Sequence, residues 1–97
     1  MAEKRNEALK SAVERLRVMV RESLGAKDQL RFLGFIDTLD QQISKGEFQM
    51  DVLQSTITRA RAATRKVLAD KPIDMVRLLN AFDTLDEELM RELAQGG

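Results

Sequence analysis

Residues 50–69 read MDVLQSTITRARAATRKVLA, and apolar or small side chains recur in this stretch every three or four positions. The positions that share this spacing are Met50, Leu53, Ile57, Ala60, Thr64 and Val67. Because an α-helix has 3.6 residues per turn, these side chains fall on one stripe. The segment is therefore predicted to be an amphipathic helix, and the small Ala60 and Thr64 indicate that a neighbour packs closely there.

The same spacing predicts three further helices, at about residues 3–24, 28–45 and 72–94. Their inward stripes are Leu9, Val13, Leu16, Val20 and Leu24; Phe32, Leu33, Ile36, Leu39 and Ile43; and Met75, Leu78 or Leu79, Phe82, Leu85, Leu89 and Leu93. Connections of a few residues make each helix antiparallel to the one before. The predicted fold class is therefore all-α, an up-down four-helix bundle.

Turn residues support these boundaries. Gly25 and Gly46 are placed to follow the ends of the first two helices, because glycine adopts the backbone conformation that often terminates a helix. Asp28 stands where a carboxylate can cap the second helix. Pro72 breaks the chain after the third helix and fits the first turn of the fourth.

The two halves of the chain resemble each other. Without a gap, 9–27 aligns with 53–71, and after two extra residues in the second half, 28–43 aligns with 74–89. The identical pairs are Leu9/Leu53, Ser11/Ser55, Arg15/Arg59, Arg17/Arg61, Arg21/Arg65, Leu24/Leu68, Lys27/Lys71, Asp28/Asp74, Arg31/Arg77, Leu33/Leu79, Asp37/Asp83, Thr38/Thr84, Leu39/Leu85 and Asp40/Asp86. Hydrophobic periodicity does not require the polar matches, above all Asp-Thr-Leu-Asp at 37–40 and 83–86. The halves are therefore interpreted as duplicated helical hairpins, about 3–45 and 50–94, packed around a pseudo-twofold axis in one domain, 1–97.

The amino-acid composition limits the classes of function that the protein can have. The chain has no Cys and no His, which removes thiol and imidazole chemistry and most zinc, haem and iron–sulfur ligand sets. Its 16 basic and 16 acidic residues cancel, so no anionic partner is indicated by net charge. Neither a bilayer-spanning segment nor a signal peptide is found. We expect a cytoplasmic protein without a cofactor or a membrane association, and not an enzyme.

The repeated charges suggest a structural ion pair in each hairpin. In an antiparallel hairpin that turns near Ala26, Arg15 lies about opposite Asp37, and the same construction sets Arg59 opposite Asp83. Such pairs are expected to flank the core and to fix the register of the two helices.

The same acidic residues support an alternative hypothesis, a magnesium site. Asp37 and Asp40 lie one helical turn apart, Asp83 and Asp86 repeat the spacing, and the pseudo-twofold axis could bring the two sets together. This pattern is similar to the all-helical nucleotide pyrophosphohydrolases, which bind magnesium through paired acidic residues on bundle helices. The resemblance covers two four-residue windows, with Asp-x-x-Asp where that family has Glu-x-x-Glu and Glu-x-x-Asp. It implies a magnesium-dependent nucleotide hydrolase.

A second alternative is a nucleic-acid-associated protein. Arg59, Arg61 and Arg65 make the third helix basic, as phosphate contacts require. The acidic fourth helix is expected to neutralise this charge, and the chain has no Tyr or Trp for stacking on bases.

The preferred hypothesis is a protein-binding module, such as an adaptor, a chaperone-like protein or an inhibitory regulator. Phe35 lies off the core stripe, Phe48 lies between the hairpins, and Gly34 allows close approach of a neighbour in mid-helix. With Arg59, Arg61 and Arg65 they are the candidate partner-binding residues. Apolar residues on more than one helix face also predict a homodimer or a higher homo-oligomer.

Overall fold

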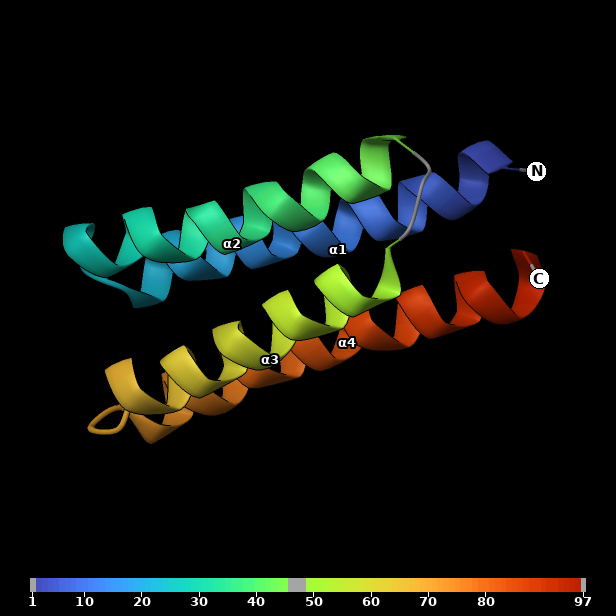
Figure 1. The fold of residues 1–97 in the computed structure, drawn as a ribbon. Helices are drawn as coiled ribbons and strands as arrows, with labels where there is room; N and C mark the ends of the chain where they lie inside the picture. Colours follow the sequence, from blue (N-terminus) through green and yellow to red (C-terminus); the bar gives the residue numbers. More distant parts are fainter. Residues whose placement is uncertain (1, 46–48, 97) are drawn as a thin grey trace.

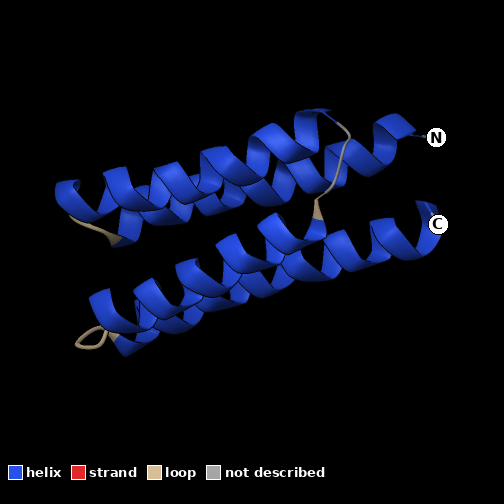
Figure 2. Ribbon diagram, viewed as in Figure 1, coloured by secondary structure: helices blue, strands red, loops and turns tan. Residues whose placement is uncertain are grey.

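The computed structural model describes residues 2–45 and 49–96, which form four helices. These are α1 (Ala2–Ser23), α2 (Ala26–Lys45), α3 (Met50–Val67) and α4 (Pro72–Gly96). Figure 1 shows them as two hairpins, α1–α2 and α3–α4, packed along each other. The described residues contain no strand (Figure 2). The predicted all-α, up-down bundle of two similar hairpins is confirmed.

The helices form a four-membered ring in which α1 and α3 each contact both α2 and α4. α1 and α3 are therefore diagonal to each other and run in the same direction (Figure 1). The pseudo-twofold axis that relates the hairpins consequently runs along the bundle. The two hairpin turns lie at one end, here called the turn end, whereas the start of α1 and the finish of α4 lie at the opposite end, here called the far end.

The core is built from equivalent positions of the two hairpins. In α2 and α4 the fully buried pairs are Phe32/Leu78, Ile36/Phe82, Leu39/Leu85 and Ile43/Leu89. In α1 and α3 the buried pairs are Leu9/Leu53, Val13/Ile57, Leu16/Ala60 and Val20/Thr64. Thr64 is tolerated in this apolar environment because its hydroxyl donates a hydrogen bond to the Ala60 carbonyl at 2.7 Å. One continuous cluster contains all these apolar side chains, that is, all of them except Thr64.

One local prediction is wrong in detail, and the open choice between Leu78 and Leu79 is decided by the structure. α2 begins at Ala26, so Asp28 lies in its first turn rather than at its cap. The Gln29 side chain instead donates to the Leu24 carbonyl at 2.7 Å and closes the end of α1. Leu78 is buried and Leu79 only half-buried, because the stripe of α4 continues through Phe82 at a spacing of four. Gly46 lies outside the described residues.

Other stripe positions lie at the edge of the core. The half-buried members pack against it and are Leu33, Met50, Val67 and Met75. Leu24 is buried just after α1 ends. In the described part of the chain, no helix combines the length and the apolar character that crossing a bilayer requires.

The equivalence of the hairpins makes a prediction about stability. Leu39→Ala and Leu85→Ala each remove a fully buried side chain at the same repeat position, so each should lower the free energy of unfolding by about 2–5 kcal/mol. Urea denaturation followed by circular dichroism measures the effect. Gln41→Ala, on the exposed face of α2, is the control and should change it by less than about 0.5 kcal/mol. A large loss for only one of the two leucines would contradict the shared core.

Candidate functional site

Each Asp-Thr-Leu-Asp motif binds one arginine from the preceding helix. In the first hairpin, the Arg17 guanidinium contacts Asp37 at 3.1 Å, Asp40 at 3.2 Å and also Glu14. In the second hairpin, Arg61 forms an ion pair with Asp83 and lies 4.0 Å from Asp86. Arginine 17 and arginine 61 are equivalent in the repeat, so the same ion-pair arrangement occurs twice.

The remaining motif residues also have a structural role. Leu39 and Leu85 are fully buried in the core. The Thr38 hydroxyl donates to the Gly34 carbonyl at 3.1 Å, and the Thr84 hydroxyl donates to the Asn80 carbonyl at 3.0 Å. The geometry of the bundle therefore accounts for all four motif positions.

The predicted ion-pair partners Arg15 and Arg59 are wrong. Asp37 pairs with Arg17 and Asp83 pairs with Arg61. Counting residues outward from the hairpin turn gives the right level of α1 for a contact with Asp37. It does not give the right side of α1, because Arg15 and Arg17 are two residues apart and project about 200° from each other around the helix. Arg15 faces α4, where it lines a hollow of about 240 Å³ with Ala81, Thr84 and Glu88.

The carboxylates keep Arg17 charged. Partial burial lowers the pKa of Arg17 by desolvation, but hydrogen bonds to Asp37, Asp40 and Glu14 outweigh this and raise the pKa above its ordinary value. A raised pKa for a cation contributes stability below its unfolded-state value, which is lost only as the pH rises past the folded-state value. That window is strongly alkaline, so this group adds no pH dependence near neutrality.

The four aspartates of the magnesium hypothesis are not brought into one cluster. Asp37 and Asp40 lie on the α1–α2 hairpin and Asp83 and Asp86 on the α3–α4 hairpin, and each pair faces its own arginine. Within the described ranges, no group of three or more His, Cys, Asp or Glu side chains is arranged to hold a metal ion. The arrangement supports register between helices rather than metal coordination.

The two hairpins differ in how fully the arginine is satisfied. Glu14, the third acidic neighbour of Arg17, is replaced by Thr58 at the equivalent position of α3. Arg61 has fewer partners as a result, and its Nε is buried without a hydrogen-bond partner among the described residues. Arg61 thus has one acidic neighbour fewer than Arg17.

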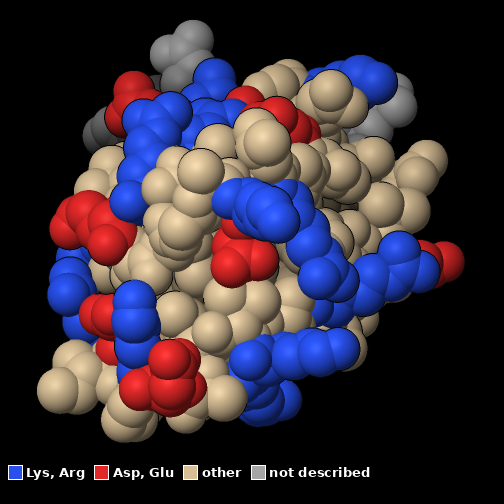
Figure 3. Space-filling model, turned by 90° about the vertical axis from the view of Figure 1, so that its left-hand side faces the viewer, with Lys and Arg blue, Asp and Glu red and all other residues tan. Residues whose placement is uncertain are grey.

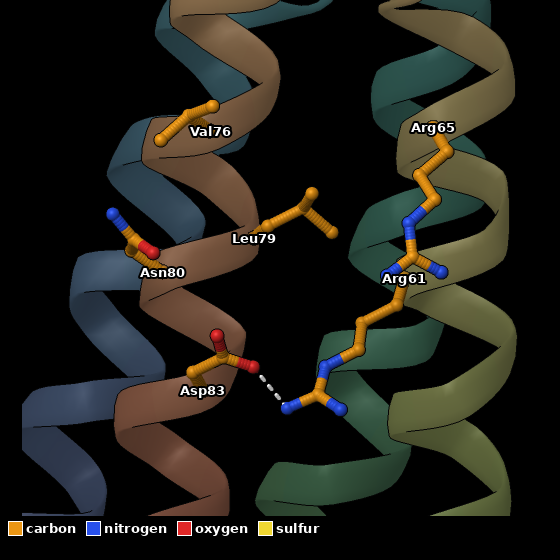
Figure 4. A pocket seen from close by; sticks show the side chains of 6 residues that line it. All are labelled: Arg61, Arg65, Val76, Leu79, Asn80 and Asp83. Carbon is orange, nitrogen blue, oxygen red and sulfur yellow. Dashed lines mark hydrogen bonds and ion pairs between the residues drawn. The ribbon is translucent and has the colours of Figure 1, made fainter.

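The predicted basic set on α3 divides between two sides of the helix. Arg61 and Arg65 line a hollow of about 210 Å³ with Val76, Leu79, Asn80 and Asp83. Figure 4 shows these residues on the outer side of the α3–α4 hairpin, with Arg61 reaching Asp83 on α4 and the Arg65 side chain lying along α3. Arg59 is exposed and two positions from Arg61, so it lies on the other flank.

The other predicted contact residues have different environments. Phe35 is half-buried; its ring packs edge-on against Phe32 at 5.8 Å, and Arg31 lies 6.0 Å from its centre. Gly34 is exposed, and an added Cβ there would meet no described neighbouring atom within 4 Å. Phe48 lies outside the described residues. Gly34 therefore belongs to an outer face of the bundle, whereas Phe35 packs against the edge of the core.

The most exposed large apolar side chains were not among the predicted contact residues. Leu30 is 77% exposed, and Val76, at the same repeat position, is 54% exposed. Ile73, in the two-residue insertion, is 76% exposed. A sequence signal existed: positions 30 and 76 are apolar in both halves although they lie off the core stripe.

Basic side chains surround these apolar residues at the turn end. The exposed ones are Arg21, Lys27, Arg31, Arg65, Lys66, Lys71 and Arg77. Figure 3 looks onto this end and shows Lys and Arg side chains spread over it, with Asp and Glu between them. Four acidic residues, Glu22, Asp28, Asp70 and Asp74, belong to the same end, so basic residues outnumber acidic ones there although the net charge of the chain is zero.

Comparisons of the chain with protein-family models, curated proteins and solved structures found no match. The surfaces of the bundle therefore provide the basis for a functional assignment.

The corrected ion pair makes a second prediction. Arg17→Gln removes the contacts to three carboxylates and should lower the free energy of unfolding by about 1 kcal/mol, whereas Arg15→Gln should change it by less than about 0.5 kcal/mol. Urea melts at low and high salt measure both, and the Arg17 effect should shrink at high salt. Equal effects of the two substitutions would contradict the assigned pairing.

Proposed function

We propose that the protein is a non-catalytic protein-binding module that contacts its partner through the outer face of the α1–α2 hairpin, around Leu30 and Gly34. The observation that carries this proposal is the exposure of Leu30, which is 77% accessible to water. Burying such a side chain against a partner is worth about 1.5–3 kcal/mol. Leu30 is therefore the side chain that we propose as the apolar anchor of the interface.

Gly34 supports the proposal because it lies one turn after Leu30 on the same side of α2. Open space at its missing Cβ allows the backbone of another helix to approach closely. Glycine in mid-helix costs about 1 kcal/mol relative to alanine. Close contact with a partner helix would explain why glycine, rather than a more stabilising residue, stands at position 34.

The surrounding charge defines the kind of partner. Arg21 and Lys27 are exposed near Leu30, whereas Asp37 on the same face is paired with Arg17. An amphipathic helix with apolar residues toward Leu30 and acidic residues at its edge fits this surface. Binding such a helix is the activity of an adaptor, a chaperone-like protein or an inhibitory regulator, and the cytoplasm is the compartment we propose for it.

The charged clusters favour this function over hydrolysis. The aspartates at 37, 40, 83 and 86 face arginines from neighbouring helices, so they serve the fold. Leu30, in contrast, is 77% exposed, so its side chain contributes little to the packing of the bundle.

The test is affinity capture with the full chain from cells of its native host, followed by binding measurements with the purified captured protein. Leu30→Asp should weaken binding by about tenfold or more, because an apolar anchor is replaced by a charge that repels an acidic partner. Val52→Asp, also at an exposed apolar position but on α3 near the far end, is the control and should bind as the wild type does. Binding that is unaffected by Leu30→Asp would contradict the proposed face.

The basic turn end favours a second candidate function, binding to a nucleic acid. The phosphates of the nucleic acid would contact Lys27, Lys71 and Arg77, which are exposed. Such binding should fall steeply as salt is raised. Retention on heparin that collapses between low and moderate salt, and that Lys71→Glu with Arg77→Glu abolishes, would support it; retention that does not respond to salt would contradict it.

A further inference from the structure

The outer face of the α3–α4 hairpin carries a second stripe of side chains that points away from the core. Along α4 it consists of Ile73, Val76, Asn80, Asp83, Glu87 and Met90, at alternating spacings of three and four. The ends of this stripe are apolar and exposed, with Ile73 and Val76 at the turn end and Met90, 50% exposed, toward the far end. The centre is polar. We call this surface the α3–α4 face.

We propose that the α3–α4 face binds a second copy of the same chain, turned antiparallel, to form a twofold-symmetric homodimer. Val76 and Met90 each lie seven residues from Asp83. Consider a twofold axis that lies between the two copies, at right angles to α4 and next to Asp83. It places Val76 of one copy against Met90 of the other, and this contact occurs twice. A surface whose two ends match each other in this way is what a closed, symmetric dimer needs.

The hollow beside Val76 provides the place for the methionine. It measures about 210 Å³ and is lined on α4 by Val76, Leu79, Asn80 and Asp83, and on α3 by the side chains of Arg61 and Arg65. A methionine side chain is unbranched and flexible, so it adapts to irregular gaps of this kind. Seating Met90 of each copy in the hollow of the other buries two exposed apolar side chains at both ends of the interface.

The charges on the face match in the same antiparallel arrangement. Arg65 lies at the turn end, and Asp51 and Glu87 lie toward the far end. None of the three forms an ion pair within the described part of the chain. An antiparallel second copy places the acidic end of one face on the basic end of the other, whereas a parallel copy would place like charges together.

The centre of the face does not oppose this contact. Asp83 would come near its own symmetry mate, but each Asp83 is paired with Arg61 in its own chain. Arg61, which also lies 4.0 Å from Asp86, therefore offsets part of the repulsion between the two copies of Asp83 at the axis.

The size of the face suits a dimer. The molecule measures 41 × 22 × 20 Å, so one long side offers an area comparable to the roughly 800 Å² per partner of a standard protein–protein interface.

The equivalent face of the first hairpin lacks the matching features. The repeat places Ser44 where the second hairpin has Met90, and Gln41 where it has Glu87. The dimer is therefore specific to the second hairpin and leaves Leu30 and Gly34 exposed on the outer side of each copy. It goes beyond the proposed partner-binding function, and either can fail without the other.

Sedimentation velocity of the full chain tests the proposal. The wild type should sediment as a dimer, with twice the 11.0 kDa mass of one chain, in a micromolar to submillimolar range. Arg65→Glu should weaken association by about tenfold or more, because it sets like charges against each other. The combined change Asp51→Arg with Glu87→Arg should do the same from the other end. Arg21→Glu, the repeat equivalent of Arg65 on the opposite face, is the matched control and should leave the dimer intact.

Mixing the two variants provides the decisive measurement. A mixed dimer contains one chain of each variant. At one end, the glutamate introduced at position 65 meets the arginines introduced at positions 51 and 87 of the other chain. At the other end, the native Arg65 meets the native Asp51 and Glu87. The 1:1 mixture should therefore dimerise although each variant alone is monomeric, with circular dichroism showing that both are folded. A monomeric wild type, a mixture that stays monomeric, or an equal loss with Arg21→Glu would overturn the proposal.

Discussion

The apolar stripes of the two hairpins can leave water only by packing against each other. Leu39 and Leu85, with their neighbours at equivalent positions, are fully buried in one cluster to which all four helices contribute. α1 must therefore contact α4 and α2 must contact α3, which makes the ring of four helices the arrangement that buries every stripe. The twofold relation of the hairpins follows from the same requirement, because equivalent stripes face a common axis.

This interior leaves the protein only outer surfaces for its function, and the repeat shows how these have diverged. The ion pairs at Arg17 and Arg61 stay alike in both hairpins because they hold paired helices in register. The positions around them differ: Gly34 corresponds to Asn80, and Ser44 corresponds to Met90. A duplicated scaffold with two different outer faces suits a module that uses one face for a partner and the other for a second copy.

The sequence was sufficient to predict the four helices, most buried positions and the equivalence of the hairpins, because hydrophobic periodicity determines which side of a helix is buried. The buried Ala12, Ala63, Leu68 and Ala81 lie off the predicted stripes. It was not sufficient to choose Arg17 over Arg15, since both lie within reach of Asp37 in a linear count and only the rotation of α1 within the bundle separates them. Gln29 as the residue that closes α1 was also missed, because its long side chain can reach several carbonyls. The exposure of Leu30 was recognisable only as an apolar residue off the stripe, whereas the hollow beside Val76 depends on side-chain positions that no pattern contains.

Native-state hydrogen exchange tests the shared interior most directly. If the two hairpins form one cooperative unit, the slowest amides of both, such as those of Leu16 and Leu39 in the first and Ile57 and Leu85 in the second, should exchange with the same free energy, equal to that of global unfolding. Protection that persists in residues 2–45 after it is lost in 49–96, or the reverse, would show that the hairpins fold separately and would contradict the account.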